Sequence, residues 1–376
     1  MSRRAELALL AAGLVCLVLF AALPLAYPGP EALPGSYLRT LRYAAGALYG
    51  ASATDLATDI VGLRALAAGE NPYPTLGPAL QSLGLDWDLD FSSTHPPTAY
   101  LLVAPVAFLS WAQASALWAL LMIICWTASL HLLGANWRVA IGLGGLLLLW
   151  PPAATSLGQL TAPWLLFLAL AYAWRELRPG AAGAAVGLAS LAKLAPALAL
   201  ISFTAAPQRR RALAGFALAW AAALGIVLAL RPAILADYWT ANQTGAIGLV
   251  EQAANGAPVA IAWRLAGVLG LLAWLLFLGA ILWRNRATLV AGSSSAWMLG
   301  FYLAVAALPL LWIYSLLPLL PVAGHGLMRR GAWGRAATLG ALALSFIAPA
   351  FGPASAPYVG GAVLLFGASL LAAEQD

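Results

Sequence analysis

Long apolar stretches follow one another along almost the whole chain, separated only by short polar or basic segments. Of the 376 residues, 63% are hydrophobic and 9% are charged, and the mean hydropathy is +0.88. No soluble core can bury so large a share of apolar residues, whereas each membrane-spanning helix needs about 20 of them. The sequence therefore predicts an all-α integral membrane protein, a single polytopic domain over residues 1–376 with about 12 transmembrane helices.

The basic residues form small clusters between the apolar runs. The clusters are Arg3 with Arg4, Arg175 with Arg178, Arg209 to Arg211, Arg284 with Arg286, and Arg329, Arg330 and Arg335. This distribution follows the positive-inside rule, so we expect every cluster and both termini on the cytoplasmic side. It also explains the excess of 19 Lys and Arg over 13 Asp and Glu without a nucleic-acid partner, which would need one continuous basic patch.

The same rule assigns a polar segment of residues 28–112 to the outer side, as one loop with interfacial helices. Later apolar runs are interrupted near Pro151 and Pro196, and a second polar outer loop is expected from Arg231 to Pro258. Several unusual polar residues would then share the outer boundary of the membrane. They are Asp55, Asp59, His95, Gln159, Lys193, Asn242 and Tyr314.

Asp55 and Asp59 lie four residues apart in a stretch with helical spacing, so their carboxylates would be neighbours on one helical face. Neighbouring carboxylates raise one pKa, and partial burial raises it further, which suits a general base. An ordinary solvated helix face would show the same spacing. The spacing alone does not decide between these two interpretations.

Lys193 is an isolated cation inside an apolar run. It lies three residues before Pro196, where we expect the helix to be interrupted. An ionisable residue at membrane depth is a functional candidate by default, and an ammonium group suits a phosphate. The alternative is a lysine that reaches the interface without binding any ligand.

His95 precedes two prolines and is a candidate for substrate binding or for plain interfacial packing. It has no His or Cys partner at metal-binding spacing, and Cys16 and Cys125 both lie in apolar runs, so no metal site and no cofactor are predicted. Asn242 is a possible hydrogen-bond donor to a ligand. Gln159 and Tyr314 could bind a ligand or serve only in packing.

Several stretches together resemble glycosyltransferase family 87, a group of polyprenol-phosphate-sugar-dependent enzymes in the GT-C superfamily. They are TDLATDIVGLRALAAGENPY, THPPTAYLLVAPVAFLSWAQASALW, SLGQLTAPWLLFLALAYAW, GAAVGLASLAKLAPALALISF, and NQTGAIGL followed by AWRL. The resemblance implies a GT-C type bundle, ranks Asp55 ahead of Asp59 as catalytic base, and gives Lys193 a contact with the lipid phosphate. In LPLLWIYSLLPLLP, Trp312 and Tyr314 remain as substrate-binding candidates, but Leu308 replaces a serine and no histidine follows.

The function implied by this resemblance is transfer of a hexose, most typically mannose, from a polyprenyl-phosphate carrier to a glycolipid or glycan hydroxyl. Transfer would occur with inversion at the extracytoplasmic face of the plasma (inner) membrane. Asp55 would act as the base, and Lys193, helped by Arg264, would stabilise the phosphate leaving group. The competing classes are a polytopic transporter and a flippase for lipid-linked sugars, neither of which would transfer the sugar.

Overall fold

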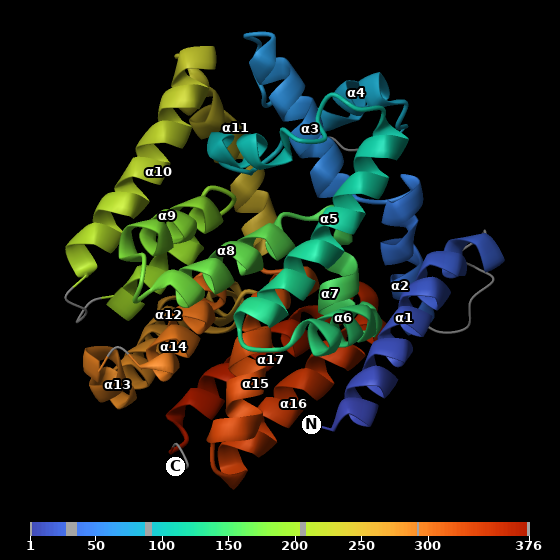
Figure 1. The fold of residues 1–376 in the computed structure, drawn as a ribbon. Helices are drawn as coiled ribbons and strands as arrows, with labels where there is room; N and C mark the ends of the chain where they lie inside the picture. The colour runs from blue at the N-terminus through green and yellow to red at the C-terminus, as the bar shows by residue number, and fades with distance from the viewer. Residues whose placement is uncertain (1, 28–35, 87–91, 204–207, 292, 374–376) are drawn as a thin grey trace.

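The computed structural model describes residues 2–27, 36–86, 92–203, 208–291 and 293–373, and within these ranges the chain forms helices and no strands. Both termini lie at the same end of the molecule, whereas α3, α4 and α11 lie at the opposite end (Figure 1). The all-α class predicted from the apolar runs is therefore confirmed.

The segment after the first helix is itself largely helical. In order come α1 (Arg3–Ala26), α2 (Ser36–Gly46), α3 (Thr54–Ala67), α4 (Leu76–Leu80) and the 3-10 helix η4 (Pro97–Val103). The expected outer segment of residues 28–112 thus contains short helices, and their interfacial position stays a prediction. Residues 28–35 and 87–91 of this segment lie outside the described ranges.

The middle of the chain alternates continuous helices with interrupted ones. It comprises α5 (Trp111–Leu132), α6 (Trp137–Leu146), η5 (Leu147–Leu149), α7 (Pro151–Thr155), η6 (Ser156–Gly158), α8 (Thr161–Trp174), α9 (Pro179–Ser190) and η7 (Ala195–Phe203). The chain bends by 87° between residues 137–149 and 151–158, at the predicted proline break. A second predicted interruption, around Lys193, separates α9 from η7.

The last part of the chain contains one helix that the sequence did not predict. Its elements are α10 (Arg209–Leu230), α11 (Ile234–Glu251), α12 (Pro258–Arg284), α13 (Arg286–Ala291), α14 (Ser294–Ala306), η8 (Ile313–Leu319), α15 (Leu320–Arg329), α16 (Ala332–Ile347), η9 (Ala348–Ser355) and α17 (Ala356–Leu371). The expectation of a polar loop from Arg231 to Pro258 is wrong, because α11 occupies most of it. Its mixed polar and apolar composition, read as a loop, also suits a helix packed on one side.

Five helices in the described ranges are long and apolar enough to cross a membrane, and the bent pair around Trp150 makes a sixth candidate. Further apolar helices, among them α8, α14 and α17, are shorter than 18 residues. These lengths make the chain a helical membrane protein. The count of about twelve crossings stays a prediction.

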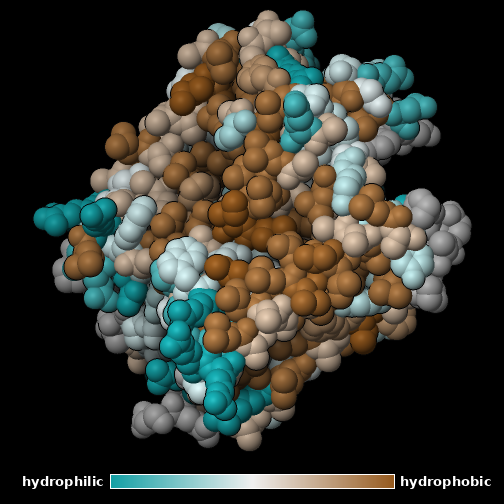
Figure 2. All heavy atoms as spheres, turned by 45° about the vertical axis from the view of Figure 1, so that its right-hand side comes forward, coloured by the Kyte–Doolittle hydropathy of each residue, from teal (hydrophilic) through white to brown (hydrophobic). Residues whose placement is uncertain are grey.

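Small residues let neighbouring helices approach closely, as is common in membrane bundles. A Cβ on Gly145 of α6 would lie 2.1 Å from the carbonyl oxygen of Gly13 on α1, and a Cβ on Gly183 of α9 would lie 1.8 Å from that of Ala212 on α10. Large apolar side chains instead face outward, including Leu265 and Leu276 on α12. Apolar atoms cover the middle of the face in Figure 2, and hydrophilic atoms gather toward its ends, as a membrane environment requires.

Candidate active site

A cavity of about 910 Å³ collects most of the polar residues singled out in the sequence. Its walls come from α3, the segment before η4, the end of η6, the break between α9 and η7, α11 and the segment between α14 and η8. The predicted site residues in its lining are Asp55, His95, Gln159, Lys193, Trp312 and Tyr314. Asp59, Asn242 and Arg264 do not line it.

The start of α3 is fixed by an unusual backbone conformation. Ala53, just before the helix, has φ 91°, a left-handed value that costs a non-glycine residue about 1–2 kcal/mol. Gly158 packs directly on it, because a Cβ at Gly158 would lie 2.4 Å from Ala53 Cα. This close contact sets the first turn of α3, which carries Asp55, beside Gln159.

Asp55 is the acid that faces the cavity. Its side chain is 29% exposed, and its Oδ2 accepts a hydrogen bond from the Tyr314 hydroxyl at 3.2 Å. The Nε2 atom of His95 lies 4.0 Å from the same oxygen. A carboxylate that is both accessible and held in place by a donor meets the geometric requirement for a general base.

Asp59, one turn later, has a different environment. Its side chain is fully buried, and its Oδ1 lies 2.7 Å from Nδ1 of His95, while Oδ2 has no hydrogen-bond partner in the described part of the chain. Burial raises the pKa of Asp59 above its ordinary value, and the attraction of His95 opposes that effect. The two carboxylates are neighbours, as the spacing predicted, but only Asp55 reaches the cavity.

His95 is fixed by its backbone as well as by its ring. Its N–H donates to Ser93 Oγ at 3.3 Å, and its carbonyl accepts from the Tyr73 hydroxyl at 3.1 Å. Burial lowers the pKa of His95, but the charge of Asp59, the hydrogen bond to Asp59 and the charge of Asp55 together raise it above 6.5. The imidazole is thus held between two acids, both of which favour its protonated form.

Lys193 lies at the break between α9 and η7, where the interrupted backbone opens onto the cavity. Its ammonium nitrogen lies over the face of the Tyr314 ring, 5.6 Å from the ring centre, and the hydroxyl of the same ring donates to Asp55. Thr98 of η4 donates to the Leu191 carbonyl at 2.8 Å and ties this break to the segment that carries His95.

A small side pocket extends from this point under the first turn of α8. Thr161 and Trp164 line it together with Asp55, Gln159 and Lys193. The Trp164 side chain is 2% exposed, and its indole N–H has no hydrogen-bond partner among the described residues. Sequence reasoning missed Trp164, because a tryptophan in an apolar helix carries no distinguishing pattern.

Asn255 is a second residue that the sequence did not indicate. It is fully buried, its Nδ2 donates to the Pro309 carbonyl at 2.9 Å, and its Oδ1 accepts from the Leu311 N–H at 3.0 Å. These bonds fix the segment between α14 and η8, which brings Trp312 and Tyr314 to the cavity.

Arg264 and Asn242 take structural positions instead of lining the cavity. The Arg264 guanidinium donates to the carbonyls of Gln252, at 3.0 Å, and Asn255, at 2.8 Å. The Asn242 amide donates to the Tyr238 carbonyl one helical turn earlier, at 3.0 Å. Both residues therefore support segments that line the cavity, without facing it themselves.

Fold and site together define a helical membrane protein with an acid, a histidine and a lysine at one polar cavity. The model for glycosyltransferase family 87 matches residues 94–313, more than half of the chain, so the protein belongs to that family. It is accordingly a membrane glycosyltransferase. The match includes His95, Lys193 and Trp312 and ends before Tyr314, and α3 precedes it. No curated protein and no solved structure matches the chain significantly.

Proposed function

We propose that this glycosyltransferase moves a hexose, in the first instance mannose, from a polyprenyl monophosphate carrier to a hydroxyl of a glycolipid or glycan. The observation that carries the proposal is the cavity that both Asp55 and Lys193 line, with Tyr314 in contact with each of them. An accessible carboxylate and a cation, on separate elements, provide one group for the acceptor and one for the leaving phosphate.

Asp55 acts as the base in this reaction. The acceptor oxygen attacks the anomeric carbon, its proton passes to a carboxylate oxygen of Asp55, and the bond from the anomeric carbon to the phosphate oxygen breaks with its electron pair. One displacement inverts the anomeric centre. The hydrogen bond from Tyr314 to Oδ2 leaves Oδ1 as the oxygen of Asp55 available for the acceptor proton.

The donor phosphate binds beside Lys193 in the main cavity, because the side pocket, of about 10 Å³, has room for no more than a water molecule. The ammonium group provides the charge there, and the first turn of α8, a 14-residue helix that lines the side pocket, adds N-terminal N–H groups that favour an anion. In the described part of the chain, the cavity and its side pocket are lined by one lysine and no arginine. One cation matches a monophosphate diester better than a diphosphate.

The rest of the cavity accommodates sugars and a lipid chain. Trp312 offers an aromatic face to a sugar, and a volume of about 910 Å³ has room for the donor head and an acceptor sugar together. The helices α3 and α11, which contribute residues to the cavity lining, lie opposite the end that holds both termini (Figure 1). With the basic clusters taken as cytoplasmic, this supports an extracytoplasmic site in the plasma membrane.

The test is sugar transfer by the purified full-length protein in detergent or liposomes. A radiolabelled polyprenyl-phosphate mannose donor is incubated with a panel of glycolipid acceptors, and the label is followed into the product. A polyprenyl-phosphate glucose donor tests which hexose is transferred. A polyprenyl diphosphate sugar tests whether the carrier must be a monophosphate. Movement of the intact donor across a liposome bilayer without any transfer would instead favour a flippase and overturn the proposal.

A further inference from the structure

Asp59 is an acid beside the cavity that the proposed reaction does not use. It has no exposed surface, so neither donor nor acceptor can contact it, yet it lies one helical turn from Asp55. A buried carboxylate is costly unless a partner compensates it. The described residues give it one such partner, the ring of His95.

The contact between Asp59 and His95 determines which nitrogen of the His95 ring lies toward Asp55. One proton lies between Asp59 Oδ1 and His95 Nδ1, whose separation is 2.7 Å. With that proton on Asp59, the neutral ring carries its N–H at Nε2, and with the proton on Nδ1, Nε2 carries an N–H in the protonated ring, which the charges of Asp59 and Asp55 favour. That N–H stands on the side of Asp55 Oδ2, at 4.0 Å.

We propose that Asp59 is a positioning residue of the transferase site, which fixes His95 so that its Nε2–H is directed at the reacting carboxylate of Asp55. The proposal rests on the proposed function and deepens it. Asp59 neither receives the acceptor proton nor contacts the sugar. It holds the ring that, with Tyr314, keeps Asp55 ionised and oriented before the acceptor hydroxyl gives up its proton.

The charged and titratable groups that face His95 come from several elements. Asp55 and Asp59 lie on α3, Lys193 lies at the break between α9 and η7, Tyr314 comes from η8, and Tyr73 follows α3. Lys193 disfavours the charged ring, whereas both acids favour it. The balance in favour of the protonated ring therefore depends on Asp59, the acid in direct contact.

The decisive variant is Asp59→Asn, assayed for transfer across pH in liposomes with the polyprenyl-phosphate sugar donor. An asparagine can offer Nδ1 either its carbonyl or its amide N–H, so the ring no longer has one fixed tautomer. The charge and hydrogen bond of Asp59 are then lost while burial remains, so the pKa of His95 falls from its wild-type value. We expect turnover about tenfold lower at pH 8 and near wild type at pH 5.5, where both ring nitrogens carry protons.

Two controls keep the test independent of folding. Asp86→Asn removes an exposed acid outside the cavity lining and should leave the pH profile unchanged. In a His95→Gln background, Asp59→Asn should cause no further loss of turnover, because Asp59 acts only through the ring. It should also restore thermal stability that His95→Gln loses, since an unpaired buried acid has been removed.

The outcomes separate this inference from the function on which it depends. If wild-type protein transfers no sugar from any donor, the proposed function fails. If wild type transfers sugar and Asp59→Asn reduces turnover equally at pH 5.5 and pH 8, the role of Asp59 is structural and the inference is wrong. Additive losses from Asp59→Asn and His95→Gln would overturn it as well. If Asp59→Asn fails to fold, the stability of the double variant against His95→Gln decides the question.

Discussion

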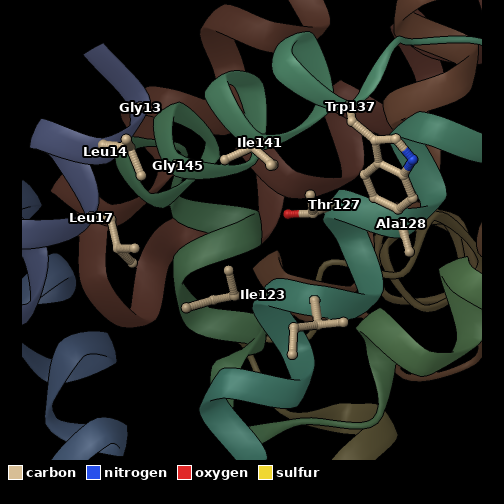
Figure 3. A pocket seen from close by; sticks show the side chains of 10 residues that line it. Gly13, Leu14, Leu17, Ile123, Thr127, Ala128, Trp137, Ile141 and Gly145 are labelled. Carbon is tan, nitrogen blue, oxygen red and sulfur yellow. The ribbon is translucent and has the colours of Figure 1, made fainter. Parts of the chain in front are cut away.

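Two hollows in this protein differ in how the surrounding helices make them. The polar cavity is lined where elements end or are interrupted, at the end of η6, the α9–η7 break and the segment before η8. A second hollow of about 260 Å³ lies between α1, α5 and α6, and Figure 3 shows Leu14, Leu17, Ile123 and Ile141 around it.

This second hollow, the apolar groove, is formed by the sides of α1, α5 and α6, whose backbone groups are already bonded within each helix. Its polar side chains are limited to Thr127 and Trp137 among the lining residues. Polar chemistry in a membrane bundle therefore requires helix ends and breaks, because continuous helices present only side chains. Substitutions in the cavity should therefore affect turnover, and substitutions beside the groove should affect stability.

The largest expected effect is that of Asp55→Asn. The amide cannot accept the proton of the acceptor hydroxyl, so turnover should fall by about 10³-fold with donor affinity little changed. Single-turnover transfer from the radiolabelled donor measures the chemical step, and Asp86→Asn is the matched exposed control. Turnover above a tenth of wild type would remove Asp55 from the role of base.

Lys193→Met should reduce turnover by about 10²-fold and weaken donor binding, because the cation that stabilises the leaving phosphate is lost. Donor binding is measured separately from turnover, by isothermal titration with polyprenyl phosphate in detergent. Arg264→Met is the comparison, since this arginine bonds the carbonyls of Gln252 and Asn255 and does not line the cavity itself. Equal loss of polyprenyl phosphate binding in both variants would contradict a specific phosphate role for Lys193.

Beside the groove, Gly145→Ala should lower the free energy of unfolding by about 2 kcal/mol. Its Cβ would lie 2.1 Å from the Gly13 carbonyl oxygen, so α1 and α6 must move apart. Gly225→Ala in α10 is the control, because its Cβ would meet no atom within 4 Å. Denaturation in detergent gives the stabilities, and turnover per folded molecule should stay at the wild-type value. A fall in turnover per folded molecule would contradict the expectation that substitutions beside the groove affect stability alone.

The smallest expected effect is that of Trp164→Phe in the side pocket. It deletes an indole N–H that has no hydrogen-bond partner among the described residues, so polyprenyl phosphate should bind up to about tenfold more weakly if a water in the side pocket links this N–H to the phosphate. Trp126→Phe, in a buried tryptophan whose N–H bonds the Gly144 carbonyl, provides a control away from the cavity. Unchanged polyprenyl phosphate binding in Trp164→Phe would exclude a role for Trp164 and leave Lys193 as the phosphate-binding residue.

Much of the fold follows directly from the order of residues. Runs of apolar residues and prolines at Pro151 and Pro196 predict helices and their breaks, because backbone hydrogen bonding inside a membrane depends on local sequence. The same reasoning failed for α11, where Asn242, Gln243 and Thr244 suggested a loop. Polarity alone cannot distinguish a loop from a helix packed on one side.

The helical membrane class, the proximity of Asp55 and Asp59, and the isolation of Lys193 all follow from the order of residues alone. That Asp55 faces the cavity while Asp59 is buried against His95, 36 residues away in the chain, follows only from how the helices pack. The same packing decides that Arg264 bonds backbone carbonyls and that Trp164 lines the side pocket. Helical periodicity fixes which side chains share a face, but which face is buried depends on the helices packed against it.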